Sequence, residues 1–233
     1  MKQVFFFAIM LLLITVGCQR FTGSGNIITQ NRNTDPFKGI SAGGAFEVEI
    51  NNGSSSKVTV ECDDNLMPYI KTKVVNGVLK ISTSEMGGFN DAHMKIFVTA
   101  PEINFISASG AATIKANNEL KSADKINIES SGAGAVKATV DAPQIYAEAT
   151  GASTIELKGR TKQYTAKASG SASLKTADLQ SETTTITASG ASSAHVHASV
   201  NLTATASGAA NIRYRGAGSL QKKTSGAADI KPE

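Results

Sequence analysis

The sequence contains no tryptophan and few other aromatic residues, which limits the kind of core that this chain can build. Aromatic residues make up 6% of the 233 residues, proline occurs 5 times, and the 41% hydrophobic fraction includes many alanines. This is not the composition of a disordered chain, which combines low hydrophobicity with high net charge. A core made of such small side chains must be thin and closely spaced, so we expect stacked thin layers rather than one thick core.

Charged residues are also scarce, at 18% of the chain, and the formal net charge is +4. Positive charge can attract nucleic acid or an anionic membrane. Here the basic residues are scattered, with no run of three, and no nucleic-acid recognition motif accompanies them. We therefore interpret them as part of a mixed, solvated surface and expect no nucleic-acid partner.

Only two cysteines are present, which is too few for a disulfide scaffold. The first, Cys18, follows an apolar run from Val4 to Ile14 that is preceded by the positive charge of Lys2. The run is too short to cross a bilayer of about 30 Å comfortably, so we predict a signal peptide rather than a membrane span. The residues Thr15-Val16-Gly17-Cys18 resemble the lipobox of bacterial lipoproteins, although Thr15 stands where leucine is usual.

The lipobox resemblance implies that Cys18 is acylated after residues 1–17 are removed. Each buried methylene of an acyl chain contributes about 0.8 kcal/mol, so several chains make a lasting membrane anchor. Residue 19 is Gln rather than Asp, and by similarity to lipoprotein sorting in enteric bacteria this favours the outer membrane, on its cell-surface or its periplasmic face. Cys62 is then left alone in an alternating strand, where we expect a buried, inert thiol.

A repeat centred on Ser/Thr-Gly-Ala decides the expected fold. It occurs seven times, at intervals of 18 to 22 residues, with its glycines at Gly110, Gly132, Gly151, Gly170, Gly190, Gly208 and Gly226. A hydroxyl residue precedes each glycine, and four residues after the glycine stands an aliphatic residue: Ile114, Val136, Ile155, Leu174, Ala194, Ile212 or Ile230. Charged residues alternate with these aliphatic ones, which indicates strands with one buried and one wet face.

Repeats of this length predict coils of roughly 60 Å contour, because strands rise about 3.3 Å per residue. Coils stacked about 4.8 Å apart would pair in parallel, with glycine where the chain turns sharply or where neighbouring backbones approach closely. We therefore expect an all-β fold, a right-handed parallel β-helix or β-solenoid. An antiparallel meander or barrel is the alternative, but the repeats lack the two-residue turn signals that such folds use.

The region before the repeats is expected to cap the stack. Residues 40–50 match the repeat if Gly44 takes the central position, and Asn76-Gly77 between two later strands predicts a hairpin. An open solenoid needs such a strand-rich cap. The expected organisation is a lipoprotein signal peptide at 1–17, a lipidated N-terminus and linker at 18–36, an N-terminal β region with the first coil and the hairpin insertion at 37–100, and the repeat solenoid at 101–233.

Several short motifs in the mature chain are similar to those of a known family. They are Gly23-Ser24-Gly25-Asn26, Phe37-Lys38-Gly39-Ile40, Gly44-Ala45-Phe46-Glu47-Val48, Asp63-Asp64-Asn65-Leu66-Met67-Pro68-Tyr69-Ile70 and the Ser-Gly-Ala repeats. Together they resemble the head GIN domain family, which is described as auto-transporter adhesins and is common among Bacteroidetes lipoproteins. The resemblance covers about residues 23 to 230. It implies a β-helical fold and an adhesive role, and it implies no residue-level site.

The best candidate for binding is the column five residues after each glycine, which is mostly basic. Its basic members are Lys115, Lys137, Lys175, Arg213 and Lys231, and Glu156 and His195 interrupt them. Stacked coils would set these charges in a line, as a strip that attracts acidic glycans or lipopolysaccharide phosphates. The alternative is that long charged side chains only solvate a flat sheet and block edge pairing.

Two other polar clusters are expected to be structural. His195 and His197 share a strand face but lack a third ligand, so we expect no metal site. The run Asp63-Asp64-Asn65 lacks the spacing of a calcium loop and predicts a turn before Leu66 instead.

Paired carboxylates could make a glycosidase on a β-helix. Glu129 and Glu148 fall at equivalent repeat positions, but the next coil places Lys167 there, which favours a surface charge ladder. We expect no enzyme activity and no cofactor.

The expected function is that of a lipid-anchored envelope protein, an adhesin-like module that presents its solenoid to a glycan or a surface protein and contacts the membrane through its anchor. The alternatives are a structural envelope protein without a soluble ligand and a carbohydrate-active enzyme.

Overall fold

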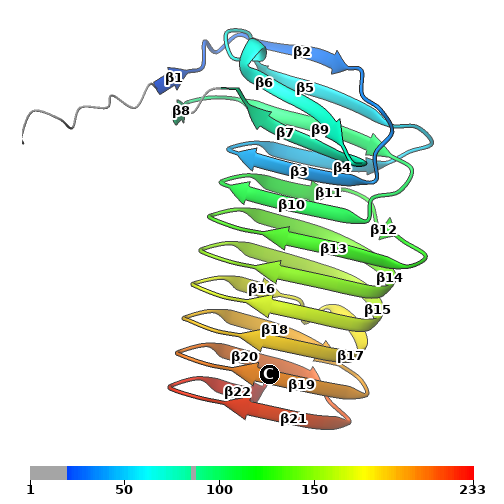
Figure 1. The fold of residues 1–233 in the computed structure, drawn as a ribbon, viewed down its shortest axis with the longest axis vertical. Coiled ribbons are helices and arrows are strands. Elements are labelled where there is room, and N and C mark those ends of the chain that lie inside the picture. The colour runs from blue at the N-terminus through cyan, green and yellow to red at the C-terminus, as the bar shows by residue number, and fades with distance from the viewer. Residues whose placement is uncertain (1–19, 85–87) are drawn as a thin grey trace, which may run out of the picture.

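The computed structural model describes residues 20–84 and 88–233, which form a tall column of β-strands (Figure 1). The one helical element in these residues is a short 3-10 turn, η1 (Met67–Tyr69). Within the same residues, no helix is long and apolar enough to cross a bilayer.

Each coil contributes strands to two faces of the column, joined at the repeat glycine. The first face, before the glycine, stacks in parallel β3 (Gly39–Gly44), β10 (Phe105–Gly110), β13 (Lys125–Ser130), the second halves of β14 (Ala135–Ala149) and β15 (Thr154–Ala168), β17 (Leu179–Ala188), β19 (Asn201–Ala206) and β21 (Ser219–Thr224).

The second face, after the glycine, stacks in parallel as well. It contains β4 (Glu47–Asn52), β11 (Thr113–Ala116), the first halves of β14 and β15, β16 (Ser173–Lys175), β18 (Ser193–Ala198), β20 (Asn211–Gly216) and β22 (Asp229–Pro232). The short β12 (Leu120–Lys121) pairs with β14 near the opposite corner. The predicted all-β parallel solenoid is therefore confirmed.

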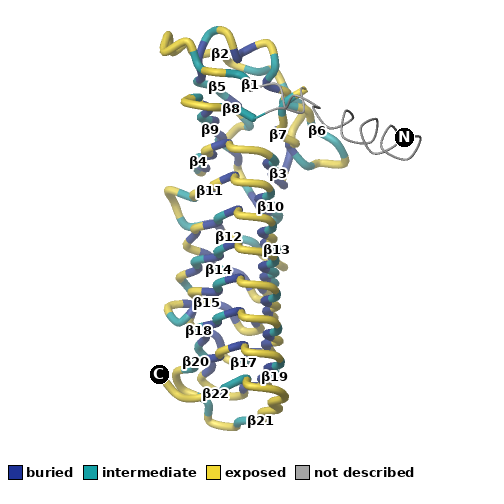
Figure 2. The backbone as a smooth tube through the Cα atoms, turned by 90° about the vertical axis from the view of Figure 1, so that its left-hand side faces the viewer, coloured by how far each residue is buried: buried dark blue, intermediate teal, exposed yellow. Residues whose placement is uncertain are grey.

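The strands stack in register, so equivalent repeat residues lie above one another. The aliphatic column from Ile114 to Ile230 runs through the interior of the column, and each of its seven members is at most 3% exposed. Buried and exposed residues alternate along the coils (Figure 2). Because the coils are thin, Ala, Ile, Val and Leu make up most of the core, and the buried aromatic side chains of the described residues are Phe37, Phe46 and Tyr164.

The repeat glycines lie at the corner between the two faces, where neighbouring coils come closest. Gly190 has φ +74°, and a Cβ atom added to it would lie 2.7 Å from the carbonyl oxygen of Gly170. The N–H of the following residue, Ala191, donates to that same oxygen at 2.8 Å. Both the left-handed backbone and the close approach therefore require glycine at this corner.

A strand-rich cap continues both faces beyond the first coil. On the first face β7 (Val78–Thr83) pairs in parallel with β3, and β6 (Ile70–Val75) pairs antiparallel with β7. On the second face β9 (Met94–Ala100) pairs in parallel with β4, followed by antiparallel β5 (Lys57–Asp63) and β2 (Ile27–Arg32). Asn76 and Gly77 join β6 to β7 with φ of 52° and 73°, which confirms the predicted hairpin.

The two ends of the column differ. Beside the cap, β1 (Arg20–Thr22) and β8 (Gly88–Asn90) form a separate two-stranded parallel ribbon. At the opposite end, β21 aligns Lys222 with the buried Ala204 of the coil before it, and Lys222 is exposed. The last strand of the first face therefore turns a charged side chain to the interior side.

The corner geometry predicts the effect of adding one methyl group. Gly190→Ala should lower the free energy of unfolding by ~3 kcal/mol, because it combines a strained φ with a clash against the neighbouring coil. Gly77→Ala is the matched control, since Gly77 has the same sign of φ but no atom within 4 Å of the added Cβ, and should cost ~1 kcal/mol. Denaturant unfolding of both variants measures the difference, and equal losses would refute the stacking argument.

Candidate functional site

Of the predicted site residues, the structure describes the basic strip but not the lipidation site. Cys18, the predicted lipidation site, lies outside the described residues, which begin at Arg20. The five basic residues of the predicted strip all lie on the second face. Together with Glu156 and His195 they form one in-register column of seven residues, in the order Lys115, Lys137, Glu156, Lys175, His195, Arg213, Lys231.

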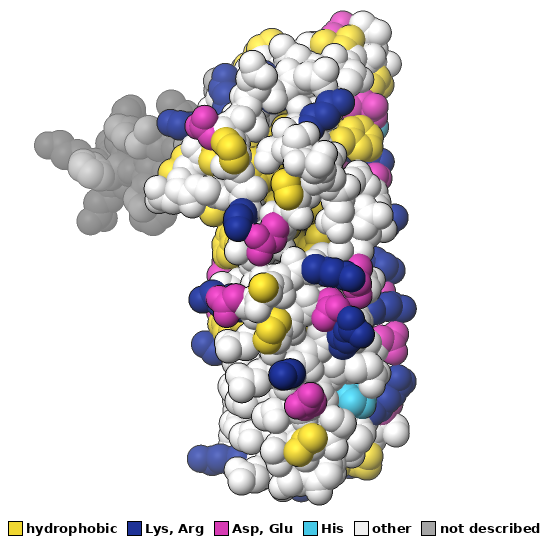
Figure 3. Space-filling model, turned by 90° about the vertical axis from the view of Figure 1, so that its right-hand side faces the viewer, with side chains coloured by type: hydrophobic (Ala, Val, Ile, Leu, Met, Phe, Trp, Pro, Cys, Tyr) yellow, Lys and Arg dark blue, Asp and Glu magenta, His cyan; other side chains and the backbone are white. Residues whose placement is uncertain are grey.

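Carboxylates neutralise more of this column than its sequence suggests. Lys137 Nζ lies 2.9 Å from Glu156, the next member of the column. Arg213 and Lys231 share Asp229, at 3.1 Å and 2.9 Å, and these two cations, Lys231 first, hold the pKa of the Asp229 carboxyl below its usual range. Basic and acidic side chains are interspersed along one side of the column (Figure 3).

Two cations of the column, Lys115 and Lys175, form no ion pair within 4 Å among the described residues, although Lys115 stands in register with Glu49 and its charge helps to lower the pKa of that carboxyl. Lys175 lines a hollow of about 410 Å³ of mixed charge, whose other charged or titratable members are Lys158, His195, Arg215, Glu156, Asp178 and Glu233. In the hollow, Arg215 Nε lies 2.6 Å from Glu233, which is also 3.3 Å from His195 Nδ1. The unpaired ammonium of Lys175 is therefore the group in this hollow that is free to meet an acidic ligand.

Sequence reasoning missed Asp229, although a signal for it exists. Asp229 stands two residues before Lys231 on the same strand, and residues two apart share a face. Its second contact, with Arg213 on the neighbouring coil, follows only from the register of stacking.

The carboxylates of the first face form the predicted ladder. Glu129 pairs in register with Glu148, and Glu148 pairs with Lys167. The Tyr146 hydroxyl donates a hydrogen bond to Glu148, and Lys167 Nζ lies 5.6 Å from the centre of the Tyr146 ring. Burial, followed by the bond to Glu148, raises the pKa of Tyr146. These contacts make an exposed mixed-charge network, with cation–π and hydrogen-bond partners for its members.

The two histidines share the outer side of β18, as the sequence predicts. His197 Nδ1 accepts the backbone N–H of Ser181 at 3.3 Å, while His195 faces Glu233. Within residues 20–84 and 88–233, no group of three or more His, Cys, Asp or Glu side chains could hold a metal ion.

The acidic run before η1 makes the predicted turn and also a clasp that the sequence did not reveal. The Leu66 N–H donates to the Asp63 carbonyl at 3.0 Å and closes the turn. The Asp63 carboxylate, buried beneath the arm, accepts the N–H groups of Gly25 at 2.7 Å and His93 at 2.8 Å. A segment 38 residues earlier in the chain is thereby fixed to the cap.

Asp64 holds the same arm from its exposed side. Its two carboxylate oxygens accept the Ser24 hydroxyl at 2.6 Å and the Asn26 side-chain amide at 2.8 Å. These two bonds, Ser24 first, lower the pKa of Asp64. Asn65 adds a bond from its side-chain amide to the Thr22 carbonyl at 2.9 Å. We call residues 22–26 the arm, and Asp63, Asp64 and Asn65 the clasp.

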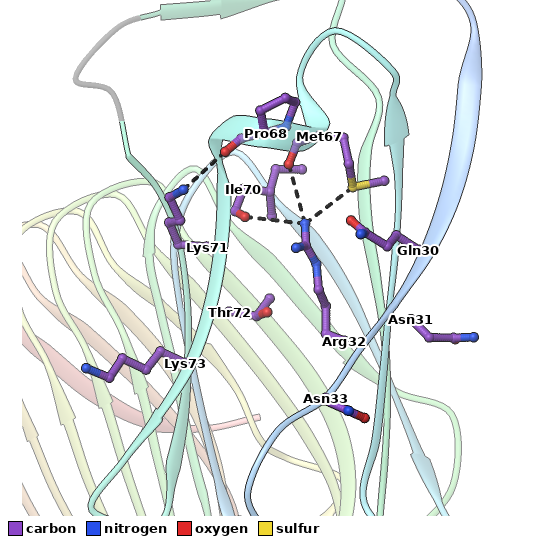
Figure 4. A pocket seen from close by; sticks show the side chains of 10 residues that line it. All are labelled: Gln30, Asn31, Arg32, Asn33, Met67, Pro68, Ile70, Lys71, Thr72 and Lys73. Atoms are coloured by element: carbon purple, nitrogen blue, oxygen red, sulfur yellow. Dashed lines mark hydrogen bonds between the residues drawn. The ribbon is translucent and has the colours of Figure 1, made fainter.

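The cap also leaves an open cleft of about 870 Å³ between β2 and β6 (Figure 4). Arg32 points into the cleft from β2, and one Nη atom donates to the carbonyl oxygens of Met67 at 3.4 Å and Ile70 at 3.5 Å. Its Nε is buried without a hydrogen-bond partner among the described residues. Lys71 and Lys73 border the cleft on β6, but their side chains extend away from Arg32 (Figure 4). The cleft is thus polar, with one guanidinium at its base.

The bonds of the clasp predict that the protection of the arm against hydrogen exchange depends on pH. The pKa of Asp64 is lowered in the folded state. The stabilisation of the arm by its carboxylate is therefore fully present above the usual aspartate pKa and is lost as the pH falls through the lowered value. Hydrogen exchange of the arm, corrected for intrinsic rates, should therefore accelerate in strongly acidic buffer and already at neutral pH in Asp64→Ala. Asp35→Ala, which removes an exposed carboxylate outside the clasp, is the control. An arm that stays protected in Asp64→Ala would contradict this role.

Comparison with solved structures supports the fold. An adhesin, described as putative, from Bacteroides fragilis is 22% identical, with 91% of this chain and 100% of that chain covered and a TM-score of 0.86. A second such adhesin, from Parabacteroides merdae, is 20% identical, with 92% and 99% covered and a TM-score of 0.68. A "putative lipid binding protein" from Parabacteroides distasonis is 20% identical, with 92% and 100% covered and a TM-score of 0.72. Comparison with curated proteins found no match.

A family comparison covers most of the chain. Residues 36–218 match the model of a family described as "Putative auto-transporter adhesin, head GIN domain". The match spans the first coil, the cap hairpin and six of the seven repeat glycines. The sequence motifs, the stacked coils and this match agree, and the chain belongs to the head GIN domain adhesin family.

Proposed function

We propose that this protein is a lipid-anchored, adhesin-like module of the bacterial envelope that presents its second face to an acidic glycan. The observation that carries the proposal is the in-register column, in which Lys115 and Lys175 form no ion pair within 4 Å among the described residues. A rigid row of repeated positions suits a repeating polymer, because successive coils offer similar groups at regular spacing. Partly neutralised neighbours would limit nonspecific attraction while the two free ammonium groups bind.

Family membership supports a place at the cell surface or in the envelope. The finer proposal is an anchor at Cys18 in the outer membrane, and it rests on the lipobox-like residues before that cysteine. The solved relatives named as adhesins favour binding over catalysis.

The two free lysines provide a direct test of glycan binding. Lys115→Glu/Lys175→Glu should weaken binding to acidic polysaccharides about tenfold, equivalent to ~1.4 kcal/mol, and the loss should shrink as salt is raised. Binding of full-length protein to immobilised polygalacturonate, with dextran as the neutral polymer, measures it. Lys125→Glu/Lys162→Glu changes the net charge equally at exposed positions outside the column and should bind as the unmodified protein does. Equal losses in both variants would leave only a net-charge effect and reject the column.

The anchor predicts different behaviour for the two cysteines. Cys18→Ser should lose labelling by a palmitate analogue, because the thiol that would carry the acyl chain is gone. Cys62→Ala is the control and should remain labelled. The Cys62 side chain is fully buried, and burial raises the pKa of its thiol to about 11, so it should also resist maleimide at neutral pH. Unchanged labelling of Cys18→Ser would reject the anchor.

A further inference from the structure

Three aromatic side chains cluster where the arm meets the cap. The ring of Phe21, in β1, lies 5.0 Å from that of Tyr69 in η1 and 5.5 Å from that of Phe89 in β8. All three side chains are only partly buried. In a chain with so few aromatic residues, this is a concentration of amphipathic and apolar rings at one end of the column.

Three lysines lie on the outer side of the adjacent hairpin. Lys71 and Lys73 lie at alternate positions of β6 and share its exposed face, and the strand begins directly after Tyr69 of η1. Lys73 stands directly opposite Lys80 of β7. Like charges in such a pair destabilise a sheet, and within the described residues none of these lysines forms an ion pair with a carboxylate. The hairpin therefore carries positive charge that the described part of the fold does not compensate.

The arm fixes this surface close to the predicted anchor. Only residue 19 separates Cys18 from β1, and two residues span at most about 7 Å. The clasp holds residues 22–26 against the cap through Asp63, Asp64 and Asn65. Between the predicted lipid and the folded body there is consequently no long tether.

We propose that the surface formed by Phe21, Tyr69, Phe89, Lys71, Lys73 and Lys80, which we call the cap patch, rests on a bilayer that contains anionic lipid. The proposal rests on the anchor proposed above and goes beyond it, because it assigns a membrane-contacting face. Aromatic rings favour the level of the headgroups. Lysines next to an anionic leaflet are attracted to it, which would relieve the repulsion between Lys73 and Lys80. The coils at the far end of the column would then lie away from the bilayer (Figure 1).

The test uses the acylated full-length protein in vesicles of phosphatidylcholine with phosphatidylglycerol. In a Cys62→Ala background, Asn90→Cys beside the cap patch and Lys223→Cys on β21 are each labelled with a polarity-sensitive fluorophore. Both replaced side chains are exposed. Lipids with a headgroup-level quencher should quench the Asn90 label at least threefold more strongly than the Lys223 label. Equal quenching at the two positions would overturn the proposal.

A charge-reversal pair isolates the contribution of the cap patch. Lys73→Glu/Lys80→Glu keeps a like-charged pair in the sheet and should reduce quenching of the Asn90 label at least twofold in anionic vesicles, with little change in neutral ones. Lys125→Glu/Lys162→Glu is the matched control and should behave as the unmodified protein does. Flotation of the protein with the vesicles in high salt tests the acyl anchor separately, because salt screens the attraction of the lysines to anionic lipid. A protein that fails to float refutes the anchor, whereas one that floats with unchanged quenching in Lys73→Glu/Lys80→Glu refutes the cap patch.

Discussion

The close approach of successive backbones at the glycine corner governs the rest of this structure. Each repeat glycine lies above the previous one. From Gly110 to Gly208 the residue after the glycine donates its N–H to the previous glycine carbonyl, as Ala191 does to Gly170 at 2.8 Å. Because the corners align, the strands on both faces start in the same register in every coil. That register places small and aliphatic side chains over one another in the interior, and it also aligns the charged residues outside. Core and surface are therefore two results of the same backbone contact.

The repetitive part of the fold was predictable because it repeats. A period-two pattern after each glycine identifies the buried column. Lys115 and Lys137 each stand five residues after their own repeat glycine, which implies that they become neighbours when the coils stack. The hairpin at Asn76-Gly77 was predictable because its turn chemistry is local. The clasp was not, since Asp63 and Gly25 come together only when β2 pairs with β5. The same holds for the cleft, where Arg32 stands at an inward position set by its pairing with Val58.

Charge is distributed differently on the cap and on the solenoid. Along the second face most cations find a carboxylate on their own strand or on the neighbouring coil, because repeated positions in register bring opposite charges within reach. On the outer side of the cap hairpin the neighbouring positions carry lysine on both strands. The cap therefore differs from the repeats both in sequence and in how far its positive charges are paired with carboxylates. Positive charge that the described part of the fold leaves uncompensated can attract an acidic partner from outside the chain.

The exposed end of a parallel stack is a template on which further strands can add, and identical copies of a solenoid would match one another in register. In this chain the inward side of β21 carries Lys222 where the preceding coil has Ala204. A second copy that continued the stack would have to enclose an ammonium group in an alanine-lined interior, which is strongly unfavourable without a counterion. The inward position of Lys222 would thus disfavour continuation of the stack by a second copy.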